Sequence, residues 1–342
     1  KTFIKDDFLK GGKNIGNSGL YNNALKIDVS SLYMSIVKSY QLYDEKKDPL
    51  KIFITIVDSM INKRLEIKEE KKTDKSLKNK DKMYKDFLNK GCYGFLATKG
   101  YLFNSPFLAS EITERGRNIL DKAIIWAQNH NLVLINADTD SISFCKEDES
   151  TIDEMEINNI LNDFRELFPK EIKWEIEEEY RKILSVKSKN YVFLNKNNEI
   201  VKKGAILKSK SKEKSLEQLI DKIIDIIFFT NDKKDIKNKI LMLYQKEVQK
   251  IQNIKDISEW CKKKTITEKT LNSKGKLFEN LILANNLEQG NEIFYFYKDD
   301  KTLELLENYD GTYSKKKILE KINQTFLIFD DIVDFALFPF IL

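Results

Sequence analysis

Acidic residues at two places in predicted β-structure constrain the fold most strongly. A strand pattern over 24–29 carries Asp28 near its end, and a hairpin pattern over 132–145 carries an Asp-Thr-Asp turn at 138–140. Taken singly, an aspartate at either place is most often a turn former. If these strands are neighbours in one sheet, however, their carboxylates converge and repel one another unless cations hold them. We therefore expect a mixed α+β fold with an acidic site at one end of a sheet.

The remaining composition excludes most other catalytic chemistry. The chain has a single histidine, His130, which we expect in a helix-to-strand turn. The cysteines Cys92, Cys145 and Cys261 are far apart and form no CxxC pair, as is usual in a reducing compartment. Carboxylates without histidine favour Mg²⁺ over zinc. Two such ions about 3.5 to 4 Å apart can hold the attacking and leaving oxygens of a phosphoryl transfer.

Charge alone does not indicate a nucleic-acid-binding protein, because 59 basic residues face 54 acidic ones and the formal net charge is only +5. Local clustering favours one. The stretch from Lys182 to Lys214 contains few acids, and the lysines between its two ends are typical of a phosphate-binding surface, namely Lys187, Lys189, Lys196, Lys202, Lys203, Lys208, Lys210 and Lys212. No apolar run reaches the roughly 18 to 20 residues that a membrane-spanning helix needs.

Hydrophobic periodicity divides the chain near residue 214. Before that point we expect a loop over 1–23, a helical hairpin at 52–96 with a charged tip at 71–82, and alternating strands and helices. The further helices are expected at 111–128 and 151–168, and the further strands at 174–176, 183–186 and 191–194. After it, Ser215 and Gln218 have the spacing of a capping box that opens a helix through 229. The remainder is expected to be mostly helical, with one aromatic strand over 293–297.

Short motifs resemble those of family B DNA polymerases in order and spacing, over nearly the whole chain. From the N-terminal end they are FLKGG at 8–12 for YxGG, DVSSLYMS at 28–35 for DxxSLYPS, the basic pair Arg64 and Lys68, KDFLNKGCYG at 85–94 for KxxxNSxYG, EITERGR at 111–117 for ITxxGR, NADTDS at 136–141 for YGDTDS, KNY at 189–191 for KxY, and the KG step at 203–204. Each motif alone is weak, but their shared order makes coincidence a poor explanation.

The resemblance implies a right-hand polymerase fold. It would have an antiparallel-sheet palm in two parts (1–50 and 97–214), helical-hairpin fingers (51–96) and a mostly helical thumb (215–342). Asp28 and Asp140 would be the principal ligands of two Mg²⁺ ions, which Mn²⁺ could replace, with Asp138 as a supporting carboxylate. Lys85 would be a catalytic group that protonates the departing pyrophosphate.

The same resemblance implies a nucleotide site and a DNA site. The nucleotide site would comprise Ser31, Leu32, Tyr33, Arg64, Lys68, Lys85, Asn89 and Tyr93. The DNA-binding residues would be Gly11, Gly12, Lys187, Lys189, Tyr191, Lys203 and Gly204. The Tyr33 ring would lie under the sugar and exclude a 2′-hydroxyl. Without the motifs, Tyr33 would be interpreted as a core aromatic and the lysines as a solvated face.

The fingers motif departs from the family pattern by one extra residue. Counting from Lys85 reaches Asn89 in the expected place, but Tyr93 then comes one position too late. One residue rotates a helix position by about 100°, so Lys85 and Tyr93 share a face only if the helix contains a π-bulge. Met34 also replaces the family's proline, and Asn136 and Ala137 replace its Tyr-Gly. None of these changes removes a predicted metal ligand.

The expected function is template-directed addition of dNTPs to a primer on DNA. The Lys-, Asn- and Ile-rich composition suggests an AT-rich genome. The compactness of the chain suggests a viral or plasmid replicon, inside a cell that would be the host if the source is viral. Exonuclease motifs would lie in an upstream or separate segment, and short spans around the fingers favour an ordinary nucleic-acid primer.

The alternatives are a catalytically degenerate DNA-binding scaffold on the same fold and, less well matched at the Asp138 turn, a reverse transcriptase.

Overall fold

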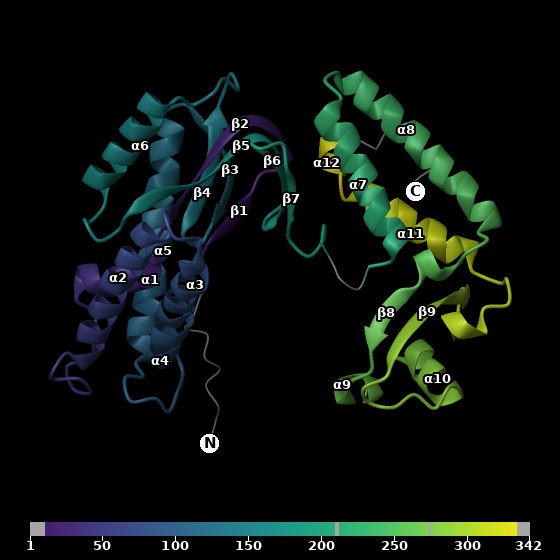
Figure 1. Cartoon of the computed structure of the whole chain (residues 1–342), viewed down its shortest axis with the longest axis horizontal. Helices are drawn as coiled ribbons and strands as arrows, with labels where there is room; N and C mark the ends of the chain where they lie inside the picture. The colour runs from purple at the N-terminus through teal and green to yellow at the C-terminus, as the bar shows by residue number, and fades with distance from the viewer. Residues whose placement is uncertain (1–10, 209–211, 273–274, 334–342) are drawn as a thin grey trace. The chain divides into compact units, whose positions relative to one another are not determined.

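The computed structural model describes residues 11–208, 212–272 and 275–333, which form two compact units. The first unit comprises the described residues up to Lys189 together with Phe193–Ile200, and the second comprises Asn190–Val192 and the described residues from Val201 onward. Figure 1 shows the elements of each unit. Phe8 of the FLKGG motif and Lys210 of the lysine-rich stretch 182–214 lie outside the described residues.

A seven-stranded sheet carries the predicted acidic residues. Its strands follow the order β1 (Asn14–Gly16), β3 (Leu132–Asp138), β4 (Ser141–Lys146), β2 (Gly19–Val29), β5 (Trp174–Lys187), β6 (Asn190–Asn195) and β7 (Ile200–Lys203). The pairings among β1 to β5 are antiparallel, as the sequence predicted. Apolar residues alternate with polar ones along β2, so Leu25, Ile27 and Val29 face the core while Asp28 lies on the other face.

Helices cover this sheet and form a hairpin beside it. Helix α5 (Pro106–Asn129) packs against β3, β4 and α1 (Leu32–Tyr40), and α6 (Glu154–Leu167) packs against β5 (Figure 1). The hairpin consists of α2 (Ile52–Glu70), the short helix η1 (Lys75–Leu77), α3 (Lys78–Asp86), the π-helix η2 (Phe87–Cys92) and α4 (Tyr93–Ala97). The predicted helical hairpin over 52–96 is therefore confirmed.

Local chemistry accounts for several helix ends. Asp153 caps α6 by accepting a 2.8 Å hydrogen bond from the Glu156 amide, and the Glu156 carboxylate accepts one of 2.8 Å from the Asp153 amide. Pro106 occupies the first position of α5, where a missing amide costs nothing. Asn131 follows the end of α5 with a left-handed φ of 56°, a conformation that asparagine tolerates.

The second unit combines helices with a small sheet. Its helices are α7 (Lys214–Phe229), α8 (Lys233–Lys250), η3 (Ile251–Asn253), η4 (Ser258–Trp260), α9 (Glu268–Leu271), α10 (Lys276–Ala284), η5 (Leu306–Asn308), α11 (Lys315–Leu327) and α12 (Asp330–Val333). Helices α7, α8 and α11 pack on one another. The sheet has the order β10 (Thr302–Leu305), β9 (Glu292–Asp299) and β8 (Lys262–Thr265). The predicted single aromatic strand is β9, and its two partners were missed.

Three local predictions were wrong. Residues 14–16 and 19–23 are strand and not loop, because long-range partners in β3 and β5 supply hydrogen bonds that their glycine-rich sequence does not reveal. The strands predicted at 174–176 and 183–186 are parts of one strand, β5. Ser215 caps nothing, because α7 begins earlier, after Glu213, whose buried carboxylate instead accepts a hydrogen bond from Lys321 at 2.5 Å.

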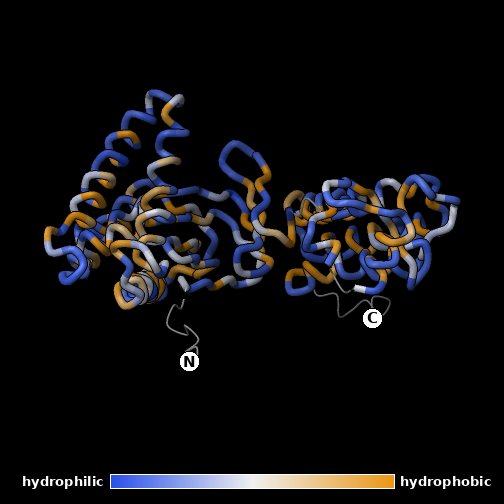
Figure 2. Tube along the Cα trace, turned by 90° about the horizontal axis from the view of Figure 1, so that it is seen from below, coloured by the Kyte–Doolittle hydropathy of each residue, from blue (hydrophilic) through white to orange (hydrophobic). Residues whose placement is uncertain are grey.

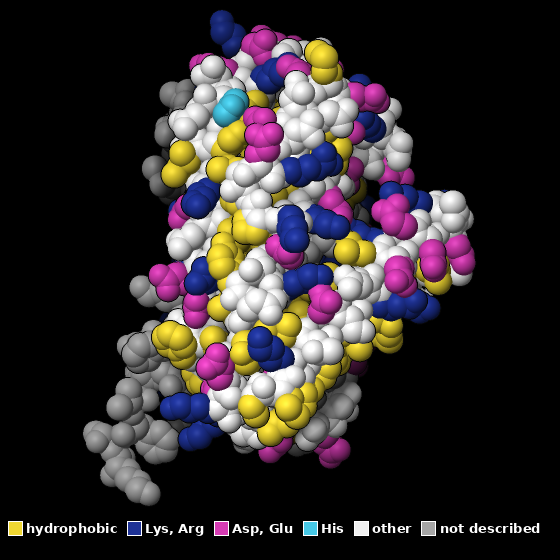
Figure 3. All heavy atoms as spheres, turned by 90° about the vertical axis from the view of Figure 1, so that its left-hand side faces the viewer, with side chains coloured by type: hydrophobic (Ala, Val, Ile, Leu, Met, Phe, Trp, Pro, Cys, Tyr) yellow, Lys and Arg dark blue, Asp and Glu magenta, His cyan; other side chains and the backbone are white. Residues whose placement is uncertain are grey.

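Hydrophobic and charged residues are both dispersed along the chain. Figure 2 shows hydrophobic positions recurring at intervals between hydrophilic ones, and none of the described helices is long and apolar enough to cross a membrane. On the face shown in Figure 3, basic and acidic side chains are interspersed. Cys92, Cys145 and Cys261 are buried free cysteines.

Candidate active site

The two predicted acidic places meet in the sheet. Strand β2 lies between β4 and β5, and Asp28 is the register partner of Ser141 on one side and of Glu175 on the other. The amide of Val29 donates a 2.8 Å hydrogen bond to the Asp140 carbonyl, which joins the end of β2 to the hairpin turn. The convergence expected from the sequence is therefore confirmed.

Burial and neighbouring negative charges hold the pKa values of both carboxyl groups above their usual range. Burial first, and then the charges of Glu177 and Asp140, raise the pKa of Asp28 from 3.8 to about 6, against the opposing charges of Lys68 and Lys85. Burial also raises the pKa of Asp140, against the opposing charge of Lys85. Ionising both carboxyl groups in this buried place is therefore unfavourable. Carboxylates with pKa values perturbed in this way are frequent at functional sites.

Glu177 is a site carboxylate that the sequence analysis missed. The register of β2 and β5 shifts between Lys26 and Ile27, whose partners are Glu178 and Ile176, so Glu177 is the extra residue of a β-bulge. Its carboxylate lies 2.6 Å from the Lys26 ammonium. The acidic run over 175–179 was a visible signal, but only the bulge selects which acid faces Asp28.

The hairpin turn is held by the segment before β2. Thr139 has a left-handed φ of 55°, and its amide donates a 2.9 Å hydrogen bond to the Lys13 carbonyl. Gly12 lies so close that a Cβ there would be 2.6 Å from the Thr139 hydroxyl oxygen. Asp138 pairs with Lys189 at 3.1 Å. This segment, predicted to bind DNA, therefore also shapes the acidic turn.

The donor set is compatible with a hard divalent cation, although no cluster of three or more His, Cys, Asp or Glu side chains is arranged as a metal site in the described part of the chain. Asp28 and Asp140 offer only oxygen ligands, and their pKa values are raised mainly by burial and further by neighbouring carboxylates. A cation between them would relieve this repulsion. The two aspartates therefore fit Mg²⁺ or a similar ion better than a soft metal.

The extra residue of the fingers motif is absorbed by a π-helix. The segment Phe87–Cys92 forms π-helical turns between α3 and α4, so the predicted π-bulge is confirmed. The Lys85 ammonium, which is exposed, influences the pKa of both Asp28 and Asp140. Tyr93 lies against Tyr33, with ring centroids 5.0 Å apart. Lys85 and Tyr93 therefore both face the region of α1 and the acidic turn.

Tyr33 connects the tyrosine pair to the acidic site. Burial first, and then the charges of Tyr93 and Asp140, raise the pKa of its hydroxyl to about 12, so the phenol stays protonated near neutral pH. Arg117, from the EITERGR motif, lowers the pKa of Tyr33 and Tyr93 through its charge and donates a 3.1 Å hydrogen bond to the Gly11 carbonyl. The motif contained Arg117, but the sequence analysis did not assign it to a site.

The basic pair on α2 is already engaged. Arg64 is buried, with Nε 3.2 Å from a carboxylate oxygen of Asp81 on α3, and its guanidinium also donates to the hydroxyl groups of Ser30 and Ser31. Lys68 forms an ion pair with Glu175 and donates to the Ser30 hydroxyl at 3.3 Å. These contacts bring the pair to the start of α1, beside Asp28.

Comparison with known proteins decides the family. A family model described as DNA polymerase family B matches residues 22–308. The chain belongs to DNA polymerase family B. The matched span contains Asp28, Asp140, the fingers motif and the KNY segment, so the resemblance seen in the sequence is confirmed.

Individual relatives of this family B chain are distant. It is 22% identical over 272 residues to a protein named DNA polymerase 1 from Saccharolobus solfataricus, covering 69% of this chain and 30% of the relative. It is 22% identical over 237 residues to DNA polymerase 1 from Aeropyrum pernix, covering 61% and 24%. The chain thus spans less than a third of the curated relatives' length.

A solved structure shares the fold. The family B DNA polymerase from the hyperthermophilic archaeon Pyrobaculum calidifontis matches with a TM-score of 0.70 and 16% identity. The match covers 93% of this chain and 46% of that structure's chain. Together with the antiparallel sheet and helical hairpin, it confirms the α+β polymerase fold expected from the sequence.

The DNA-binding residues predicted for this family B chain fall in both units. Lys187 ends β5 and Lys189 follows it in the first unit, where both side chains are exposed. In the second unit Tyr191 is half-buried in β6, Lys203 ends β7 and is exposed, and Gly204 has a left-handed φ of 96°. Each group is thus accessible within its own unit.

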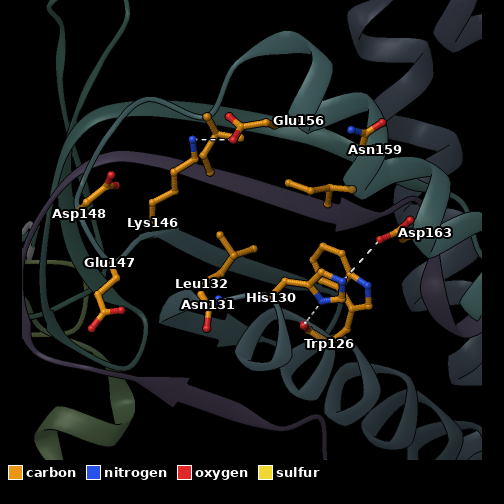
Figure 4. A pocket seen from close by; sticks show the side chains of 12 residues that line it. Trp126, His130, Asn131, Leu132, Lys146, Glu147, Asp148, Glu156, Asn159 and Asp163 are labelled. Carbon is orange, nitrogen blue, oxygen red and sulfur yellow. Dashed lines mark hydrogen bonds and ion pairs between the residues drawn. The ribbon is translucent and has the colours of Figure 1, made fainter.

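A cavity of about 420 Å³ lies at the opposite end of the β3–β4 hairpin from the acidic turn, where Leu132 pairs with Lys146 (Figure 4). Trp126 lines it and stacks on His130, with ring centroids 4.1 Å apart. His130 ends α5, as expected for a turn residue. Because none of the predicted site residues is among the described residues that line it, this cavity is separate from the candidate active site of the polymerase chain.

Proposed function

We propose that this chain is the polymerase core of a family B enzyme that adds dNTPs to a primer 3′ end on a DNA template. The observation that carries the proposal is the meeting of Asp28 and Asp140, from strands distant in sequence, with the lysine of the fingers motif. We assign residues 1–50 and 97–214 to the palm, 51–96 to the fingers and 215–342 to the thumb. Family membership supports this assignment.

Asp28 and Asp140 would hold the metal, with Asp138 in support. Two bound Mg²⁺ ions, or Mn²⁺ in their place, would neutralise charge on the attacking and leaving oxygens of the phosphoryl transfer. The contribution of the chain is to hold two carboxylates together at the cost shown by the raised pKa of Asp28. The Lys189 ammonium, 3.1 Å from Asp138, limits the negative charge at the turn.

Lys85 and Lys68 would bind the triphosphate directly, and Arg64 would shape the same site. Lys85 is exposed and has no carboxylate within ion-pairing distance among the described residues, so it can reach a phosphate or protonate the departing pyrophosphate directly. Lys68 would exchange its ion pair with Glu175 for a phosphate oxygen. Arg64 is buried against Asp81 and would act mainly by orienting the Ser31 hydroxyl at the start of α1. The amides of Ser31, Leu32 and Tyr33 at that helix start suit a phosphate.

The tyrosine pair would select the sugar and the base pair. The Tyr33 ring, close to Asp140, is suited to lie under the sugar and exclude a 2′-hydroxyl. Tyr93, 5.0 Å from it, would face the nascent base pair with the help of the half-buried Asn89. This arrangement depends on the π-helix, because an ordinary α-helix would rotate Tyr93 about 100° away from the Lys85 face.

Primer and template would be held by backbone contacts that carry no sequence preference. Lys187, Lys189, Tyr191, Lys203 and Gly204 would steady the primer strand, and Gly11 and Gly12 would contact DNA beside the acidic turn. The partners we propose are thus primer-template DNA and dNTPs, together with an upstream or separate exonuclease segment. A viral or plasmid genome is the replication setting we propose.

The test is a primer-extension assay with Mg²⁺, four dNTPs and a primed DNA template. We expect templated extension by the wild type and none by Asp140→Asn. Asp148→Asn is the matched control, because Asp148 is an exposed aspartate at the other end of the same hairpin, and it should extend normally. If the wild type binds the primed template tightly but does not extend it, the polymerase proposal is refuted. That result would favour a catalytically degenerate DNA-binding scaffold.

A further inference from the structure

Helices α1 and α5 approach closely at Gly116, which is buried in the middle of α5. A Cβ atom at this position would be 3.2 Å from Cε1 of Tyr33, 3.5 Å from Cδ2 of Leu32 and 3.7 Å from Cδ1 of Ile36. The last two are ordinary van der Waals separations, whereas the first is tighter than side chains normally allow. An added methyl group would therefore act mainly on Tyr33.

The helix itself does not require glycine at this position. Gly116 lies within a regular helix and is not among the glycines with positive φ, so an alanine fits the backbone. Glycine in a helix interior is also less favourable than alanine, because its backbone loses more freedom on folding. The Tyr33 ring explains the glycine, because it lies so close to α5 that it leaves little room for a Cβ atom at this position.

The Tyr33 ring has little freedom to move away from α5. The Tyr33 ring packs against the Tyr93 ring, with centroids 5.0 Å apart, and much of the Tyr33 side chain is buried. Its hydroxyl is near enough to Asp140 for that carboxylate to raise its pKa. A displacement of a few tenths of an ångström away from Gly116 would thus move the ring toward the Tyr93 side of the candidate nucleotide site.

We infer that Gly116 is a positioning residue for the nucleotide site: its missing side chain lets the Tyr33 ring rest against α5 and leaves room for a deoxyribose. This inference rests on the proposed function and adds a specificity-determining residue to it. Gly116 acts through Tyr33 and touches neither substrate nor metal. Its effect should therefore appear in nucleotide binding, and only while the tyrosine ring is present.

The experiment is a double-mutant cycle with Gly116→Ala and Tyr33→Ala, measured by single-nucleotide incorporation of dNTP and rNTP. Gly116→Ala is expected to raise KM for dNTP about fivefold or more with kcat changed less than about twofold, the pattern of lost ground-state binding. In the Tyr33→Ala background, the same substitution should leave KM unchanged, because the ring that it displaces is gone. Tyr33→Ala alone should increase the use of rNTP.

Glu114→Ala is the matched control, since Glu114 is exposed on the same helix and its substitution should change neither constant. An unchanged KM in Gly116→Ala, or an equal rise in KM with and without the Tyr33 ring, would overturn the inference while leaving the polymerase activity intact. If the wild type does not extend a primer and Asp140→Asn behaves identically, the proposed function fails, and the positioning role fails with it.

Discussion

Replacing Asp28 with asparagine should stabilise the first unit while it abolishes activity. The carboxylate is mostly buried, and burial with the charges of Glu177 and Asp140 raises its pKa from 3.8 to about 6. A shift of about two units corresponds to about 3 kcal/mol at 1.4 kcal/mol per unit. Asparagine has nearly the same shape and no charge, so Asp28→Asn should gain up to about that amount wherever the wild-type group is ionised.

The sign of the pH dependence follows from the direction of the shift. The folded state holds the Asp28 proton more tightly than the unfolded state, so this group destabilises the wild type progressively as pH rises from about 4 to about 6. Above that window the penalty is constant. The advantage of Asp28→Asn should therefore be about 3 kcal/mol at pH 7.5 and about half that at pH 5.

Urea denaturation in EDTA measures this difference. A Trp260→Phe background removes the only tryptophan of the second unit, so fluorescence of Trp126 and Trp174 reports the first unit alone. Asp148→Asn serves as the control, because Asp148 is fully exposed and its pKa is lowered by a hydrogen bond from the Ser150 amide. It should give no stabilisation at either pH.

Two results would refute the reasoning. The first is an Asp28→Asn variant no more stable than the wild type at pH 7.5. It would mean that burial and the neighbouring charges do not disfavour the ionised Asp28 carboxylate. The second is a stabilisation equal at pH 5 and pH 7.5, which would point to a packing effect and not to charge. Adding Mg²⁺ should reduce the stability difference between Asp28→Asn and the wild type, because a cation between the carboxylates would reduce their repulsion in the wild type.

Three further substitutions test other parts of the site. Lys85→Met should reduce kcat/KM for dNTP by about 10²-fold or more in single-turnover incorporation, and unchanged rates would remove Lys85 from the chemistry. Deletion of the exposed Lys90 should convert the π-helix to an α-helix with the family spacing, so Lys85 and Tyr93 should keep one face and extension should be retained within about threefold, as in Lys90→Ala; a loss of about tenfold or more would contradict this role of the extra residue. Gly16→Ala should destabilise the first unit by about 1 to 3 kcal/mol in urea denaturation, because its Cβ would lie 2.5 Å from the Ser188 amide nitrogen. A Gly16→Ala variant as stable as the wild type would show that the backbones at Gly16 and Ser188 can move apart without loss of stability.

Local patterns in the sequence were sufficient for much of the candidate site. The turn at 138–140 and the strand ending near Asp28 follow from alternation and turn chemistry, which depend on neighbours a few residues away. The π-helix followed from the family resemblance, because one residue more than the family motif between Lys85 and Tyr93 has few ways to keep both on one face. These features are local, so the order of residues along the chain contains the information.

Long-range pairing decided the rest. Glu177 enters the site through a bulge whose position depends on the register of β5 against β2, and the acidic run over 175–179 contains no mark of that register. The burial of Arg64 against Asp81 depends on how two helices of the hairpin pack. The sequence by itself determined which residue types carry the chemistry and on which local elements they lie. Only the tertiary structure decided which of those groups meet, because strand register and helix packing are set by contacts between segments far apart in the chain.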